Sequence, residues 1–144
     1  MKTVRQILDK KGHDVYSVTP DDSVFTALQL MADKNIGAVV VVDNKQVVGI
    51  LSERDYARKV VLHGKTSKDT PVRDIMTGKV LYVKPDNTSD ECMALMADKR
   101  IRHLPVLENE NLTGIISISD IVQAIIEEDK YIIEQLENYI TGGR

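Results

Sequence analysis

The chain contains the same stretch of sequence twice. Residues 15–60 align with residues 80–125 at an offset of 65 positions and without a gap, and 16 of the 46 aligned pairs are identical, against about 3 expected from average residue usage. The identities come in blocks, such as Leu30–Lys34 on Leu95–Lys99. Because a duplicated unit this short is expected to share one core with its twin, the seam between the copies is a natural place for a ligand.

A shorter lead-in is also duplicated. Val4–Leu8 corresponds to Val72–Met76 at an offset of 68, so the first copy carries three extra residues between its lead-in and its first predicted strand. With 144 residues, the chain suits one compact domain or two tightly joined halves. The repeat divides it into residues 1–66, with the first copy, and residues 67–144, with the second.

Composition narrows the class of protein. Hydrophobic residues make up 42% and charged residues 28% of the chain, which is typical of a globular protein. The net charge of −3 argues against a general nucleic-acid or membrane-surface binder. The single Cys92 fits a reducing compartment, no apolar signal segment opens the sequence, and the longest apolar run, residues 38–42, is too short to span a bilayer. We therefore expect a cytoplasmic protein that binds neither nucleic acid nor membrane.

Each copy predicts the order β-α-β-β-α, and hence a fold of the α/β (α+β) class. The first copy predicts strand 14–18, helix 23–34, strand 38–42, strand 47–51 and helix 52–62. The second copy predicts strand 80–83, helix 88–99, strand 103–107, strand 112–117 and a last helix from about Ser119. A polar and basic segment, residues 63–78, connects the copies and is predicted to lead into a short helix.

The last helix is predicted to reach Ile140, well past the end of its counterpart in the first copy. Its apolar residues are Ile121, Ile125, Ile132, Ile133, Leu136 and Ile140. No partner for this stripe exists inside the repeat. It therefore predicts either a contact with another subunit or a helix that folds back over its own core.

A motif of the form Gly-x-x-Ser-x-x-Asp stands in both copies where the third strand gives way to the closing helix. Its members are Gly49, Ser52 and Asp55 in the first copy and Gly114, Ser117 and Asp120 in the second. One interpretation is structural, because Ser-x-x-Asp resembles a capping box that satisfies the free N–H groups of a helix start. The other is that the helix start binds a ligand. Since a carboxylate there would repel a phosphate, it is better matched to a ribose diol.

A phosphate would need its own cation, and Arg102 is the candidate. It precedes strand 103–107, beside the strand that delivers Ser117. Its twin in the first copy is Gly37, so the two sites cannot be equivalent. The alternative for Arg102 is a solvated charge at the edge of a strand.

Together and in order, these elements resemble a tandem pair of cystathionine-β-synthase (CBS) domains, also called a Bateman module. The resemblance covers nearly all of the chain and includes both Gly-x-x-Ser-x-x-Asp elements, residues 35–39 and 100–106, and the lead-in at 72–77. Residues 52–60, followed by Gly64-Lys65-x-Ser67, look like the small stand-alone bacterial members. The resemblance implies a pseudo-twofold α/β disc with two clefts between the copies. Such clefts commonly bind AMP, ADP, ATP, S-adenosylmethionine or NAD(H), and such modules usually pair into homodimers.

The resemblance also implies which residues form each cleft. In the first cleft, adenine would contact Tyr16, Ile36, Gly37 and Ala38, ribose would contact Asp120 and Ser117, and phosphate would contact Ser119 and Arg102. In the second cleft, the base would contact Leu81, Ile101, Arg102 and His103, and ribose would contact Ser52 and Asp55. Arg54 stands there where Ser119 stands in the other copy. Arg54 and Arg58 would supply cationic contacts suited to a second or larger phosphate group.

The sequence does not predict an enzyme or a metal site. His13, His63 and His103 lack metal-ligand spacing, and neither a Gly-x-Ser-x-Gly nor a P-loop segment is present. The leading hypothesis is a non-catalytic regulatory module that senses adenine nucleotide and acts through an unidentified partner protein or through its own homodimer. The alternative is a structural or interaction protein whose clefts stay empty and whose last helix binds the partner. A third hypothesis, a small nucleotide hydrolase or transferase, would need a positioned base and usually a metal.

Overall fold

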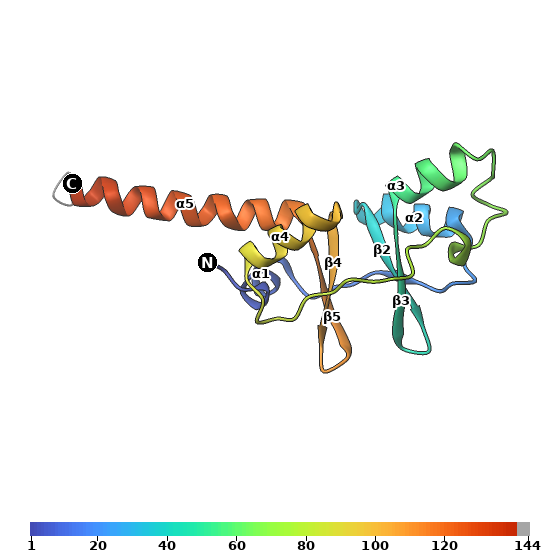
Figure 1. Cartoon of the computed structure of the whole chain (residues 1–144), viewed down its shortest axis with the longest axis horizontal. Helices are drawn as coiled ribbons and strands as arrows, with labels where there is room; N and C mark the ends of the chain where they lie inside the picture. Colours follow the sequence, from blue (N-terminus) through green and yellow to red (C-terminus); the bar gives the residue numbers. More distant parts are fainter. Residues whose placement is uncertain (141–144) are drawn as a thin grey trace.

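The computed structural model describes residues 1–140 and shows two α/β repeats side by side, with the last helix projecting from the second (Figure 1). In the first repeat, β1 (Ser17–Val18) runs parallel to β2 (Ala38–Asp43), which pairs antiparallel with β3 (Gln46–Ser52). Helix α2 (Val24–Lys34) connects β1 to β2 and is capped by Ser23, whose side chain accepts a hydrogen bond from the Thr26 N–H. The mixed α/β class and the element order of the first repeat are as predicted.

The closing helix of the first repeat differs from the single helix expected at residues 52–62. It starts as α3 (Glu53–Tyr56) and continues as a π-helix, η1 (Ala57–Val61). The wider turn is seen in the bond from the Leu62 N–H to the Ala57 carbonyl, five residues back, at 3.3 Å. Such π-helical turns occur often at functional sites.

The second repeat contains α4 (Ser89–Lys99) and the antiparallel pair β4 (His103–Glu108) and β5 (Asn111–Ser117). The strand predicted at 80–83 does not form, and Val83 makes only an isolated parallel bridge to Val106. In the first repeat the Val40 N–H donates to the Tyr16 carbonyl at 3.3 Å. The residue at Val40's place in the second repeat is Pro105, which has no N–H to donate, so this pairing cannot extend.

The buried residues form two clusters, one in each repeat, rather than the single shared core that we expected, and the lead-ins are exchanged between them. Helix α1 (Val4–Lys11) buries Val4, Ile7 and Leu8 in the core of the second repeat. The lead-in of the second copy forms a short 3₁₀ helix, η2 (Val72–Asp74), and buries Val72 and Ile75 in the core of the first. Each repeat is therefore completed by a segment that belongs to the other copy in sequence.

Equivalent backbone hydrogen bonds hold the two lead-ins. The Arg5 N–H donates to the Pro85 carbonyl at 3.0 Å, and the Arg73 N–H donates to the Pro20 carbonyl at 3.0 Å. Arg5 and Arg73 are equivalent positions of the two lead-ins, and Pro20 and Pro85 are equivalent positions of the two copies. The division at residues 66 and 67 stays a prediction, and residues 141–144 at its end lie outside the described part of the chain.

The glycine that opens each Gly-x-x-Ser-x-x-Asp motif makes room for a lead-in. A Cβ at Gly114 would lie 2.7 Å from both Cδ atoms of Leu8, and a Cβ at Gly49 would lie 2.6 Å from the Met76 sulfur. Real carbon contacts are about 3.5–4.0 Å. The motif therefore has a packing role that is independent of any ligand.

Helix α5 (Ile118–Ile140) begins one residue before the predicted start and packs on the second repeat only through its first turns, where Ile121 and Ala124 are buried. Every residue from 131 to 140 is exposed, and this half of the helix extends away from the body (Figure 1). It does not fold back over the core. No helix within residues 1–140 is long and apolar enough to cross a membrane.

Candidate functional site

Two cavities lie along the seam between the repeats, and they share Gly37, Arg102 and His103 in their walls. The shared residues come from the segments that lead into β2 and β4. This position explains why Arg102 was predicted to contribute to both clefts, whereas Gly37 was predicted for the first alone and His103 for the second alone.

The first cavity has a volume of about 620 Å³. It is lined by all eight residues predicted for the first cleft: Tyr16, Ile36, Gly37, Ala38, Arg102, Ser117, Ser119 and Asp120. The structure thus brings these residues together, while their contacts with a ligand stay a prediction. Their apolar members come from the segment that enters β1, from β2 and from the turn between α2 and β2. Most of their polar members come from the junction of β5 with α5.

The Ser117–Asp120 pair forms the capping interaction that one interpretation of the motif predicted. The Ser117 N–H donates to the Asp120 carboxylate at 2.8 Å, and the Asp120 N–H donates to the Ser117 hydroxyl at 3.2 Å. The carboxylate also forms a salt bridge with the Lys11 ammonium group at 2.6 Å. Capping occupies part of the carboxylate, and the remaining acceptor positions are available to another donor, because an ionised carboxylate accepts about four hydrogen bonds.

Lys11 was missed by the sequence reasoning. Its ammonium group also donates to the Ile115 carbonyl at 2.7 Å, so it is held at the wall of the first cavity by two contacts. It reaches this place only because α1 packs on the second repeat. No local sequence signal marks it, although it lies three residues after the duplicated lead-in Val4–Leu8.

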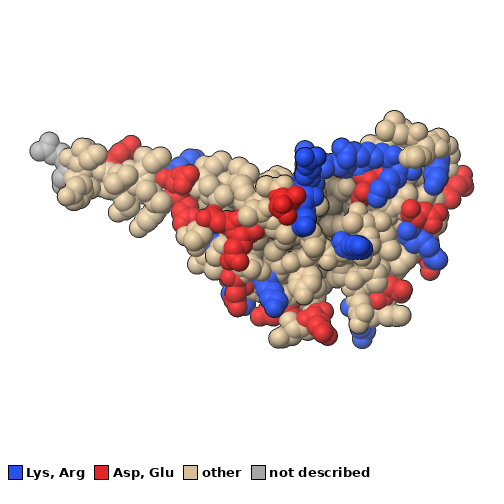
Figure 2. Space-filling model, in the orientation of Figure 1, with Lys and Arg blue, Asp and Glu red and all other residues tan. Residues whose placement is uncertain are grey.

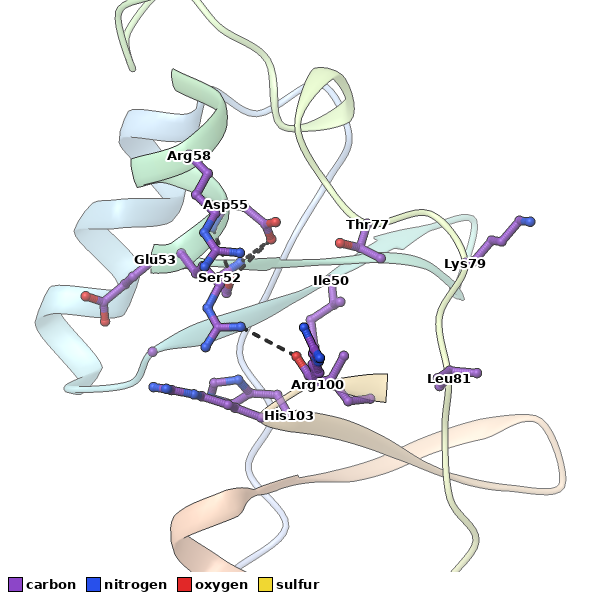
Figure 3. Close-up of a pocket in the computed structure, with 14 residues that line it drawn as sticks. Ile50, Ser52, Glu53, Asp55, Arg58, Thr77, Lys79, Leu81, Arg100 and His103 are labelled. Atoms are coloured by element: carbon purple, nitrogen blue, oxygen red, sulfur yellow. Dashed lines mark hydrogen bonds between the residues drawn. The ribbon is translucent and has the colours of Figure 1, made fainter. Parts of the chain in front are cut away.

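The second cavity has a volume of about 480 Å³ and is shown in Figure 3. It is lined by all eight residues predicted for the second cleft: Leu81, Ile101, Arg102, His103, Ser52, Arg54, Asp55 and Arg58. Further lining residues that were not predicted are Ile50, Glu53, Thr77, Lys79 and Arg100. Lys79 and Arg100 correspond to Asp14 and Asn35, which line the first cavity but were not predicted for it either.

Ser52 and Asp55 repeat the capping geometry of the other copy. The Ser52 N–H donates to the Asp55 carboxylate at 3.0 Å, and the Asp55 N–H donates to the Ser52 hydroxyl at 3.2 Å. In Figure 3, Ser52, Asp55 and Arg58 lie on one side of the cavity, and Thr77 and Leu81 lie on the other. The Asp55 carboxylate also contacts the Lys59 ammonium group at 3.3 Å.

The electrostatics of the seam are dominated by cations. In the space-filling view, Lys and Arg side chains border a hollow between the two repeats (Figure 2). Burial, together with the nearby Lys11, lowers the pKa of His103 from its ordinary value of 6.5, which keeps this imidazole neutral at pH 7. His103 therefore offers a neutral ring between the two cavities.

Other places for potential chemistry are clusters of metal-ligating side chains and the single cysteine. No group of three or more His, Cys, Asp or Glu side chains that could hold a metal ion is found among residues 1–140. Cys92 is buried in the second core, as predicted, and burial raises the pKa of its thiol to about 11. A thiol with such a high pKa is a poor nucleophile at neutral pH.

The fold and the paired clefts define a module of two α/β repeats with ligand-sized cavities at its seam. The CBS domain model matches the chain twice, over residues 4–62 and 72–127. The chain belongs to the CBS domain family, as a tandem pair of these domains.

Relatives and solved structures agree with this assignment. The CBS domain-containing protein CBSX3, mitochondrial, of Arabidopsis thaliana is 38% identical over 98% of this chain and 73% of its own length. A putative signal-transduction protein with CBS domains from Burkholderia ambifaria is 53% identical, with a TM-score of 0.85 over 88% of this chain and 95% of that chain. The CBS domain pair of protein MJ0100, solved in complex with 5′-methylthioadenosine and S-adenosyl-L-methionine, has a TM-score of 0.79 over 89% of this chain and 98% of that chain. At 23% identity, this last likeness shows the fold alone.

Proposed function

We propose that this chain is a regulatory module that binds an adenine nucleotide or a related adenosine ligand in the clefts between its repeats and has no catalytic activity. The observation that carries the proposal is the composition of the two cavities. Each combines apolar residues, which suit a purine, with a Ser–Asp pair at a helix start, which suits a ribose diol. The adenosine ligands bound by the MJ0100 domain pair support it.

In the first cleft, we assign adenine to the wall formed by Tyr16, Ile36 and Ala38. The ribose diol would donate to Asp120, and the phosphate would lie between Ser119 and Arg102. In this arrangement the phosphate would be kept apart from the Asp120 carboxylate. The Lys11 ammonium group, 2.6 Å from that carboxylate, balances its charge.

The second cleft repeats the arrangement with a different base wall. Leu81, Ile101 and His103 would contact the base, and Ser52 and Asp55 would contact the ribose. Ligands that bind both repeats at once would hold them together and would shift a conformational equilibrium by the difference in affinity between its states. The partner protein that receives this signal, and a cytoplasmic location, belong to the proposal.

Thermal unfolding of the purified protein with AMP, ADP, ATP, NAD, NADH and S-adenosylmethionine tests the proposal. A ligand that binds only the folded state stabilises it by about 2.7 kcal/mol at a hundredfold excess over its Kd. Titration calorimetry of each hit gives the affinity and the number of occupied clefts. If protein free of co-purified nucleotide shows no shift with any of these ligands, the nucleotide-sensor function is refuted.

The ribose contact is tested separately with Asp120→Asn, which keeps an acceptor for the Ser117 N–H but removes the charge. One lost charge-assisted hydrogen bond should weaken AMP binding about tenfold or more. Asp43→Asn, at an exposed position outside both cavities, is the matched control. Unchanged AMP affinity in Asp120→Asn and in Asp120→Ala would remove the assignment.

We also propose that the chain forms a homodimer through α5. Val122, Ile126, Ile133, Leu136 and Ile140 are all at least 42% exposed. Their spacing alternates between four and three residues when Asp129 is included, which is the spacing of a coiled-coil seam. Leu136→Glu should give a monomer by light scattering.

The exposed half of α5 also favours the alternative function, an interaction module with empty clefts. Deletion of residues 127–144 distinguishes the two functions. If the deletion abolishes association with a partner and no nucleotide affects that association at any concentration, the interaction module is supported and the sensor is not.

A further inference from the structure

The two cavities differ in charge although the repeat relates their positions. The second cavity is lined by five cationic side chains, Arg54, Arg58, Lys79, Arg100 and Arg102, and by two carboxylates, Glu53 and Asp55. The first cavity is lined by two cationic side chains, Lys11 and Arg102, and by two carboxylates, Asp14 and Asp120. The second cavity is therefore strongly positive, whereas the charges of the first balance.

Two pairs of twin positions make the second cavity more positive. Arg54 stands where the first cavity has Ser119, and Arg100 stands where the first has Asn35. Arg58 and Lys79 contribute further cations, whereas Glu53, which stands where the first cavity has Ile118, contributes a carboxylate.

The cations of the second cavity lack carboxylate partners. Within residues 1–140, none of the five forms an ion pair, whereas Lys2, Lys10 and Lys11 elsewhere on the chain each do. Arg54 donates to the Arg100 carbonyl at 3.5 Å, which brings two of the arginine positions together. In Figure 3, the Glu53 carboxylate and the Lys79 ammonium group both point away from the cavity, on opposite sides of it. Cationic side chains that line one cavity without carboxylate partners repel each other and favour a bound anion.

Arg100 shows that the charge is kept at a conformational cost. It caps the end of α4 in the left-handed region, with φ of 55°, and its twin Asn35 caps α2 with φ of 54°. Asn adopts this conformation readily and Arg does not. Local stability would favour Asn or Gly at residue 100, and an anion bound by the arginine would offset this cost.

We propose that the second cleft binds a ligand that carries two or more phosphate groups, and that the first cleft takes a ligand with at most one. The proposal deepens the nucleotide-binding function proposed above and rests on it for the nucleoside part of the ligand. Arg54 and Arg58 on one side and Arg100 and Arg102 on the other would contact the additional phosphates. Arginine is suited to this role because its planar guanidinium group donates two parallel hydrogen bonds to phosphate.

The test is titration calorimetry with AMP, ADP, ATP and inorganic tripolyphosphate on the wild type and on Arg54→Ser/Arg100→Asn, which installs the residues of the first cleft. In the wild type, ATP should bind at least about tenfold more tightly than AMP, because each charge-assisted contact is worth that much or more. The double variant should lose this preference and still bind AMP. Without ligand and at low salt, the double variant should also melt at a higher temperature than the wild type. It removes part of the repulsion between the cations and the strain of an arginine in the left-handed conformation.

Lys45→Glu is the matched control. It changes the net charge by two units, as the double variant does. Residue 45 lies in a hairpin turn outside both cavities, and its twin position, residue 110, already holds a glutamate. It should keep the preference for ATP.

The outcomes separate the two proposals. If nucleotides bind with equal affinity for AMP and ATP, or if the double variant keeps the preference, the polyphosphate inference is overturned and the nucleotide function stands. If tripolyphosphate binds and no nucleotide does, the inference is supported and the nucleotide function fails. If neither binds, both are overturned.

Discussion

The exchange of the lead-ins predicts a strong energetic coupling between Leu8 and Gly114. Leu8 is 1% exposed and packs in a cluster with Leu104, Ile116 and Ile121, all of which are fully buried. Leu8→Ala should cost about 2–5 kcal/mol of unfolding free energy. The upper half of this range is expected, because the neighbours are held by β4, β5 and α5 and cannot close the space.

Gly114→Ala alone should destabilise the protein for the opposite reason. Its new methyl group would lie 2.7 Å from both Cδ atoms of Leu8, well inside van der Waals contact. Overpacking of this kind costs about 1–3 kcal/mol. In the double variant this methyl group occupies space that the Leu8 side chain has left, so the two costs should fall short of additivity by at least about 1 kcal/mol.

Urea unfolding of the wild type, both single variants and the double variant measures the cycle. The equivalent cycle in the other repeat, Met76→Ala with Gly49→Ala, is the control and should also couple, because a Cβ at Gly49 would lie 2.6 Å from the Met76 sulfur. Additivity of the Leu8 and Gly114 changes within about 0.5 kcal/mol would refute the packing of α1 against β5.

Three further predictions concern titratable groups. Hydrogen bonds from Lys10 and Lys2 lower the pKa of Glu127 from 4.5 to about 2, so its stabilising effect is present above about pH 4.5 and is lost as the pH falls through about 2. Between about pH 5 and about pH 2.5, thermal melts should therefore show a larger loss for the wild type than for Glu127→Gln. Burial raises the pKa of Cys92 to about 11, so a thiol reagent at neutral pH should react with it only after unfolding in urea, and immediate reaction of the folded protein would contradict this. Burial lowers the pKa of His103 below 6.5, so the unfolded state takes up its proton first and stability should decline below that pH. His103→Gln should decline less in urea titrations at about pH 7.5 and about pH 5.5, and an equal decline would contradict the assigned cause.

The hairpins and the strand-to-helix junctions could be predicted because their signals are local, whereas the residues of each cleft were implied by the resemblance to CBS domains. A run of β-branched residues at 38–42 marks a buried strand, and the Gly-x-x-Ser-x-x-Asp spacing marks a strand-to-helix junction, whatever surrounds them. The duplication then places two such junctions in equivalent positions. All fifteen residues predicted for the clefts line one or other of the two cavities.

The missing strand at 80–83 shows a limit of reading one segment at a time. The apolar pattern of these residues resembles that of the first strand, but a strand extends only where its neighbour can continue the hydrogen-bonded pairing residue after residue. Pro105 cannot donate, and it lies more than twenty residues away in the sequence. The prediction was wrong because the pattern was judged without its partner.

Residue type and spacing are enough to establish the internal symmetry, the α/β class and the chemistry available at each strand-to-helix junction. Three further features emerge only when the chain is packed: each lead-in completes the opposite core, Lys11 reaches Asp120, and five cations share one cavity. These features escape a linear pattern because burial and charge pairing are gained between segments far apart in the chain. A local pattern shows that Leu8 is apolar, but only the packed molecule shows that Gly114 leaves the space it fills.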